Sequence, residues 1–182
     1  MRAGPAWIHA SCQLHASPPE SKRIEAKGGI PMERQFVAEN ARERERLRAL
    51  VPRMNEEDLN LKLGEGWTIA SALAHLAFWD QRALVLMKRW KRGGVAPSLV
   101  DTDAVNDALL PLCLAIPSRA AANLAVAASE AIDQELEQAS PELIAEIERL
   151  GDKFRLWRSE HRRVHLDEIE AVLSSRGRGS NA

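Results

Sequence analysis

Cysteine is scarce in this sequence, which contains only Cys12 and Cys113. Two cysteines are too few for a disulfide framework, and neither has another cysteine close enough in sequence to form a metal-binding or redox pair. We expect both to be free thiols. The chain also lacks an apolar run approaching the roughly 20 residues that a membrane-spanning helix needs, and its N-terminus lacks the apolar core of a secretion signal. The expected location is therefore the cytoplasm.

The sequence also has no excess of positive or negative side chains. The 25 basic and 26 acidic side chains give a formal net charge of -1. No global field therefore draws the protein to nucleic acid or to an anionic membrane. The basic run ARERERLR at residues 41–48 does not change this expectation, because its arginines alternate with Glu43 and Glu45 and can pair with them along a helix. Neither nucleic acid nor a membrane is an expected partner.

Strand-like alternation, a glycine-rich phosphate loop and internal repeats are absent as well, so the sequence predicts an all-α protein. A length of 182 residues with 45% hydrophobic side chains suits one domain with a core of its own. Apolar residues recur at helical spacing in four long segments, which predicts a four-helix bundle. The four predicted helices cover residues 33–51, 68–92, 118–139 and 153–175.

Local signals set the limits of these helices and of two shorter ones. Thr68 can cap the second long helix by accepting a backbone hydrogen bond. A short helix is expected over residues 102–111, where Pro111 would end it, and another over residues 140–151. Along the second long helix, apolar residues alternate at spacings of four and three, as in a helix packed inside a bundle: Ile69, Leu73, Leu76, Ala83, Met87 and Trp90.

The ends of the chain show no apolar periodicity. Residues 1–31 carry Gly, Pro and Ser throughout, so we expect a disordered extension before a bundle at residues 32–176 and a flexible tail at 177–182. Purine-rich codons of ribosome-binding type would encode the segment at 27–29, so translation is expected to begin at Met32. A peptide from residues 1–20 in the native protein would contradict this interpretation. His9 and His15 therefore carry little weight as ligands.

Three other histidines form a candidate metal site. His161 and His165 are four apart, so on a helix their Cβ atoms lie roughly 5–6 Å apart on one face and both imidazoles can reach one ion. His75 belongs to a different predicted helix of the same bundle. Three imidazole ligands leave one coordination position open for water or substrate, as in catalytic zinc sites. The alternative is that the histidines only pack in the core or meet solvent.

The residues around the histidines exclude several known helical metal motifs. A zincin needs Glu directly after its first histidine, but Arg162 stands there. A carboxylate-bridged di-iron bundle needs Glu three residues before a histidine on two helices, but Ala72, Arg158 and Arg162 hold those positions. A mononuclear divalent ion with nitrogen ligands remains. The number of imidazoles alone does not decide between zinc, nickel, iron and other metals, and zinc or nickel is the metal we expect first. No residue stands out as a general base.

Three carboxylates are candidates to orient the imidazoles. A metal-bound imidazole usually donates its second ring N–H to an acceptor, and the nearest acids in sequence are Asp80, Glu160 and Glu168. Asp80 also interrupts the apolar seam of its helix. A carboxylate at such a position is costly to bury unless it is paired, so it is either a structural ion pair or part of a site.

Two tryptophans and one amide are candidates to line a cleft. Trp79 lies four residues after His75, and Trp157 precedes His161 by four on the expected stripe of the last helix. Either ring can be a substrate platform or simple core filler. Asn106 lies in the connection after the second long helix, where it can line a cleft or make a local cap or turn.

The segments WTIASALAHLAFWD and HRRVHLDEIE, at this separation in an all-helical chain, resemble the DinB-like superfamily, which includes the metal-binding domain of mycothiol-dependent maleylpyruvate isomerase. The resemblance spans about residues 32–175. It implies a four-helix bundle in which His75, His161 and His165 hold a divalent ion. The additional C-terminal domain of the isomerase has no counterpart after residue 175, so that specific activity is not expected.

The resemblance also implies a class of reaction. Members with known activity are similar to thiol S-transferases and isomerases that use low-molecular-weight thiols, and others look like metal-dependent hydrolases. We therefore expect an enzyme whose ion activates a low-molecular-weight thiol or water against a small electrophilic substrate. The alternative is a non-catalytic helical module, dimeric in one version, whose histidines form a structural metal site or are simply core residues and whose surface binds a partner.

Overall fold

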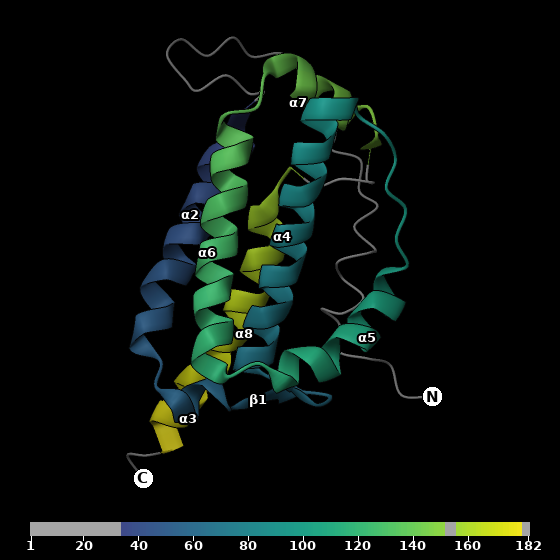
Figure 1. Cartoon of the computed structure of the whole chain (residues 1–182). Helices are drawn as coiled ribbons and strands as arrows, with labels where there is room; N and C mark the ends of the chain where they lie inside the picture. The colour runs from purple at the N-terminus through teal and green to yellow at the C-terminus, as the bar shows by residue number, and fades with distance from the viewer. Residues whose placement is uncertain (1–33, 152–155, 180–182) are drawn as a thin grey trace.

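The computed structural model describes residues 34–151 and 156–179, with side chains to residue 176. The predicted disordered extension at 1–31 and the proposed start at Met32 lie outside the described residues. Four long helices pack as a ring in which α4 contacts α6, α6 contacts α2, α2 contacts α8, and α8 contacts α4 (Figure 1). The prediction of an all-α four-helix bundle is confirmed. The four helices are α2 (Gln35–Leu50), α4 (Ile69–Gly93), α6 (Ser118–Glu137) and α8 (Arg158–Gly179).

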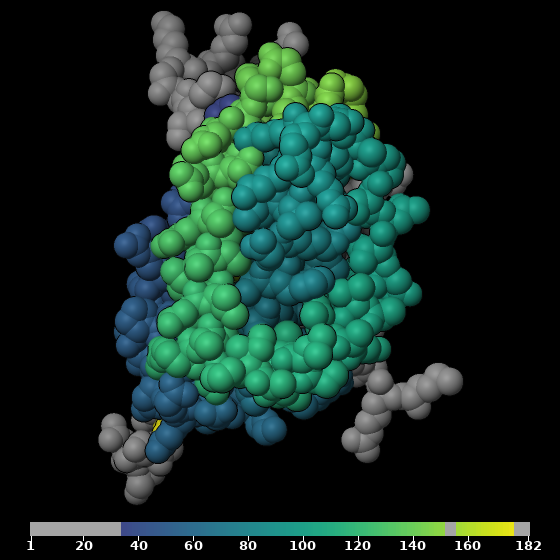
Figure 2. Space-filling view, in the orientation of Figure 1, coloured from purple at the N-terminus to yellow at the C-terminus, as the bar shows by residue number. Residues whose placement is uncertain are grey.

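Short elements connect the long helices. They are η2 (Val51–Arg53), α3 (Glu56–Leu59), β1 (Lys62–Gly64), β2 (Trp67–Thr68), α5 (Thr102–Ala115) and α7 (Pro141–Glu148). The antiparallel hairpin of β1 and β2 was not predicted. Its turn has positive φ at Glu65 (41°) and Gly66 (88°), which suits a tight two-residue hairpin loop. Two strands this short show no alternation in the sequence. In Figure 2 the front face of the molecule is formed by α6 and α4, with α5 along one side of α4.

Helix α4 begins where the sequence predicted. The side chain of Thr68 accepts a hydrogen bond from the backbone of Ser71, and Ser71 bonds back to the backbone of Thr68, which completes a reciprocal cap. Helix α5 does not end at Pro111 but continues to Ala115. Both Pro111 and Asp107, whose carbonyl the proline leaves without a helical donor, are exposed. Water can replace the lost hydrogen bond there, so the helix tolerates the proline.

Helix α8 begins at Arg158 and not at Lys153, and it runs on to Gly179. Asn40 of α2 determines this start, because its Oδ1 accepts the backbone N–H of Ser159 at 2.8 Å and its Nδ2 donates to the carbonyl of Leu156 at 2.9 Å. Asn40 therefore acts as a cap supplied by another helix. Periodicity along a single segment cannot reveal such a contact.

The core consists of two apolar clusters with a polar layer between them. One cluster gathers around Leu73, Leu47 and Leu166, and the other around Met87, Ile132 and Phe36. Each of the four helices contributes to the layer between them. We call these buried residues the polar layer: Asn40, His75, Asp80, Ser129, Asp133, Arg158, His161, Arg162 and His165. Among the described residues, no helix is long and apolar enough to cross a bilayer.

Candidate metal centre

The three histidines meet inside the polar layer. His75 comes from α4, and His161 and His165 come from successive turns of α8. Nε2 of His161 lies 3.2 Å from Nε2 of His75 and 3.2 Å from Nε2 of His165. Two nitrogen ligands of a tetrahedral zinc ion are about 3.3 Å apart, because each Zn–N bond measures about 2.0–2.1 Å. The spacing of the three side chains therefore fits a single small cation, and their candidate ligand atoms all lie within 4.8 Å of one another.

Aromatic edges surround His75. The Trp67 ring lies 5.4 Å from the His75 ring, and the Trp79 ring lies 6.3 Å from it, both in edge-on geometry. The three imidazole centroids are 4.9 to 5.2 Å apart. Tight packing of this kind fixes the ring orientations, because each imidazole is held by neighbours on several sides. A preformed ligand set loses little conformational entropy when it binds an ion.

Burial keeps two of the imidazoles neutral, those of His75 and His165. Desolvation, together with the charge of Arg158, lowers the pKa of His75 to about 4. Desolvation also lowers the pKa of His165 well below its usual value, and the neighbouring His75 adds to the effect. A metal ligand must be the neutral imidazole, so these two side chains are in the binding form at neutral pH.

Arg158 controls the proton on His161. Its guanidinium lies 3.4 Å from Nδ1 of His161, and a guanidinium can only donate. This contact therefore needs an unprotonated Nδ1, which leaves the His161 proton on Nε2, where His75 and His165 can accept it. A metal at Nε2 needs the other tautomer, with the proton on Nδ1. Binding an ion would thus move one proton and loosen the contact with Arg158.

A buried ion network lies beside the histidines. Arg162, fully buried, donates to Oδ2 of Asp80 from both Nε and Nη2, and to both carboxylate oxygens of Asp133. Burial alone lowers the pKa of Arg162, but the two carboxylates outweigh it and raise the pKa overall. Arg44, near the surface, also donates to Asp133 at 3.1 Å. The two carboxylates therefore hold α8 to both α4 and α6.

The carboxylate candidates have different positions. Asp80 is bonded to arginine and not to histidine, because its Oδ1 accepts from Nε of Arg158 at 2.7 Å. It reaches His161 only through Arg158. The structural pairing that the sequence allowed for Asp80 is thus present, next to the candidate centre. Glu160 and Glu168 are half-buried on α8, and their role as acceptors for the imidazoles stays a prediction.

Trp79 and Trp157, the two tryptophans expected near the site, lie in different surroundings in the structure. Trp79 donates its indole N–H to Oδ1 of the buried Asn106 at 3.1 Å, which joins α4 to α5 beside His75. Asn106 is therefore not a local cap. Trp157, expected on the helical stripe of the histidines, precedes α8, is 37% exposed, and packs edge-on against Phe36 of α2. Trp157 does not share a helix face with the histidines, because α8 begins at Arg158, one residue after it.

Several residues of the site were not predicted from the sequence. Arg158 and Arg162 served only to exclude other motifs, and Asp133 was not singled out. A signal was present for Asp133, because it is a carboxylate in a helix that is rich in Ala and Leu on several sides. The interruption of the apolar seam at Asp80 likewise required a buried cation, but no rule of spacing identifies which arginine supplies it.

Comparison with known families gives a match that covers most of the bundle. The sequence profile of the DinB superfamily matches residues 39–169, which is most of the chain. The matched region begins within α2 and ends within α8, so it contains all three histidines. Comparison with curated proteins and with solved structures gave no significant match. The family resemblance of the two histidine segments is thereby confirmed.

Proposed function

The chain belongs to the DinB superfamily, and on that premise we propose that it is an enzyme that depends on one divalent metal ion. His75, His161 and His165 would hold the ion, with zinc or nickel the favoured metals. The observation that supports this most strongly is that three buried imidazoles bring candidate ligand nitrogens within 4.8 Å of one another, with Nε2 of His161 3.2 Å from Nε2 of both His75 and His165. Hydrogen bonds between the imidazoles would also bring these nitrogens to 3.2 Å, so the metal content of the protein decides between the two arrangements.

The donor set defines the chemistry that the site can support. Three imidazole nitrogens would hold a divalent ion, which would supply Lewis acidity that lowers the pKa of a bound thiol or water. Burial raises the pKa of Cys113, so this thiol is a poor nucleophile. The nucleophile is thus proposed to come from outside the chain, as a low-molecular-weight thiol or as water, and to attack a small electrophilic substrate.

The surrounding residues prepare this site. Asp80 offsets the charge of Arg158, so that a cation is tolerated beside it. Arg158 offers a hydrogen-bond donor next to His161. Trp79, fixed by Asn106, shields one side of His75 from water, which strengthens electrostatic interactions inside the site. Thiol S-transfer, isomerisation and hydrolysis all fit this arrangement.

Metal analysis of protein purified without a histidine tag tests the proposal. We expect about one ion per chain, and its loss when His161→Ala and His165→Ala are combined. The matched control combines His9→Ala with His15→Ala, which removes two histidines outside the proposed centre and should leave the metal content unchanged. Protein that is fully folded by circular dichroism but free of metal, even after incubation with zinc or nickel, would leave only the non-catalytic module.

Activity is the second test. Metal-loaded protein is assayed for consumption of a panel of small electrophiles, with and without low-molecular-weight thiols. Turnover that depends on both metal and thiol supports a transferase or isomerase, and turnover with metal alone supports a hydrolase. Equal rates for the metal-loaded protein and the His161→Ala, His165→Ala variant would contradict an enzymatic role for the centre.

A further inference from the structure

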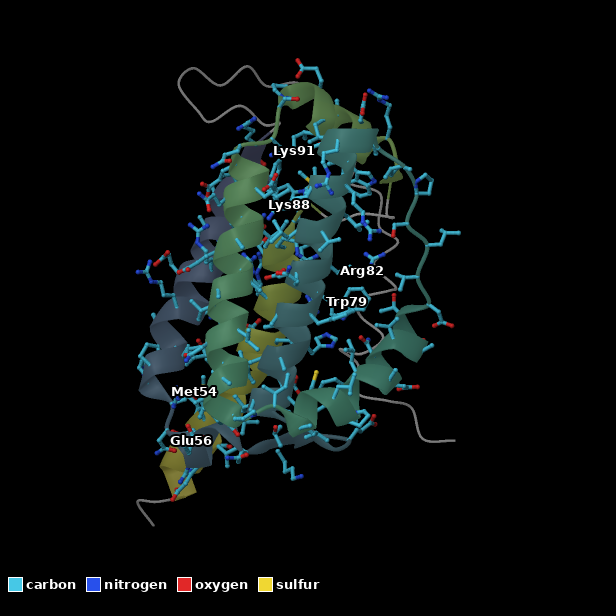
Figure 3. All side chains as sticks on the ribbon, in the orientation of Figure 1. Met54, Glu56, Trp79, Arg82, Lys88 and Lys91 are labelled. Atoms are coloured by element: carbon cyan, nitrogen blue, oxygen red, sulfur yellow. The ribbon has the colours of Figure 1, made fainter. Side chains whose placement is uncertain are left out.

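A groove of about 320 Å³ lies on the outer side of α4, beside the connection at residues 94–101. Phe78, Val85 and Leu86 supply an apolar wall, and the guanidinium groups of Arg82 and Arg89 lie along the same groove. The labelled side chains of Trp79 and Arg82 leave α4 on the side of this connection and of α5 (Figure 3). The groove therefore combines apolar surface with two positive charges and none of the proposed metal ligands.

Arg82 is held by neutral groups. Its Nη2 donates to the carbonyl oxygen and the hydroxyl of Ser98 at 3.2 and 2.9 Å, and its guanidinium lies 5.7 Å from the centre of the Trp79 ring. No ion pair among the described residues involves Arg82. Burial, and then repulsion by Arg158, lower the pKa of Arg82, although an arginine remains protonated at neutral pH.

We infer that this groove binds a small organic anion with an apolar body. A half-buried guanidinium whose hydrogen-bond acceptors are neutral gains strongly from a carboxylate or phosphate, which it can bind through charge-assisted hydrogen bonds. Arg89, an exposed side chain that also lines the groove, adds a second charge. The apolar wall suits a short alkyl chain or a ring, and the volume lies at the low end of the range for small-molecule sites.

The groove adjoins the histidines through one ring. Trp79 contacts Arg82 on one side and His75 on the other. An anion bound at Arg82 would thus lie one indole away from the proposed metal centre. The groove itself needs no metal, so anion binding there does not depend on the proposed enzymatic function.

Calorimetric titration of the full chain with octanoate and octyl phosphate tests the inference, with octan-1-ol as the neutral compound of the same chain length. Each titration is made on protein treated with EDTA and on protein loaded with zinc. We expect at least one of the anions to bind about tenfold more tightly than the alcohol in both preparations. Equal binding of the alcohol, no binding of either anion, or binding only with zinc present would overturn the assignment to the groove.

Variants locate the bound anion. Arg82→Gln is expected to weaken anion binding about tenfold, and Arg89→Gln less, since Arg89 is exposed. The matched control is Arg92→Gln, an exposed arginine of the same helix outside the groove, which should bind as the unmodified chain does. Unchanged affinity in Arg82→Gln would refute the inference. If that variant does not fold, Arg89→Gln and the comparison of anion with alcohol still decide.

Discussion

Asp80 and Arg162 meet in the middle of the bundle, where Nε and Nη2 of Arg162 donate to the same carboxylate oxygen at 3.1 and 2.9 Å. The two residues are 82 positions apart in the chain. Because Arg158 donates to the other oxygen of Asp80, a single carboxylate serves two buried cations. The charge that holds α8 against α4 is also the charge that shields the histidines from Arg158.

Replacing Asp80 is expected to destabilise the fold severely. Asp80→Ala leaves two buried guanidinium groups short of a counter-charge, and removing one partner of a buried ion pair costs about 3–5 kcal/mol. Glu57→Ala is the matched control, because Glu57 pairs with Arg176 on an exposed surface and such a pair contributes less than about 1 kcal/mol. Urea unfolding measures both. Equal losses in the two variants would show that the buried network does not stabilise the fold.

Acid is expected to destabilise the metal-free protein through its buried histidines. The folded pKa of His75 is about 4, whereas an unfolded histidine titrates near 6.5. The unfolded chain therefore binds more protons between these values, and the free energy of unfolding falls with falling pH. For His75 alone the loss between pH 7 and pH 5 is about 2 kcal/mol, and His165 shifts in the same direction.

Unfolding of EDTA-treated protein in urea at pH 7, 6 and 5 measures this effect. His75→Gln removes one of the titrating groups, so its free energy of unfolding should depend less steeply on pH over the same range. An identical slope in the variant and the unmodified chain would mean that His75 is not buried in its neutral form.

Zinc is expected to stabilise the folded chain through the histidines. An ion that binds only the folded state at 100 times its dissociation constant raises the free energy of unfolding by about 2.7 kcal/mol. His75→Gln should lose most of this gain, because it removes one of the three ligands, while His9→Gln should retain it. Thermal unfolding with and without zinc measures the difference. Equal stabilisation of both variants would place the zinc elsewhere.

The hydrogen bond between Trp79 and Asn106 is expected to hold α5 to α4. Trp79→Phe keeps a ring in place but leaves the buried Oδ1 of Asn106 without its donor, which costs about 1–3 kcal/mol. Trp157→Phe is the control, because its ring is partly exposed and packs at the edge of the bundle. Amide hydrogen exchange should speed up in α5 for the first variant only. Protection of α5 that is the same in both variants would contradict this role.

The parts of the fold that depend on local pattern could be predicted from the sequence. The apolar seam of α4 is buried at all six predicted positions, since helical spacing alone determines which side chains share a face: Ile69, Leu73, Leu76, Ala83, Met87 and Trp90. Thr68 and Ser140 cap their helices because hydroxyl side chains accept backbone hydrogen bonds there. The histidine pair on α8 followed from the same periodicity.

The parts of the fold that depend on contacts between helices could not be predicted from the sequence. Arg162 finds Asp80 and Asp133 on two other helices, and no pattern within α8 encodes that pairing. The start of α8 depends on Asn40 of α2, so periodicity extended the helix too far toward its N-terminus and placed Trp157 on it. A turn of positive φ at residues 65–66 made a hairpin from a segment that looks like a polar connection.

The polar layer between the two apolar clusters also fixes the axial register of the helices relative to one another. Leucines and alanines pack acceptably against many partners, so the clusters alone tolerate a helix that slides along its axis. A slip of α8 by one turn, about 5.4 Å, would carry Arg162 away from both carboxylates and into an apolar cluster with its charge uncompensated. The side chains that surround the histidines thus favour one register of the helices along the bundle axis. This register also determines where along the axis the three imidazoles meet.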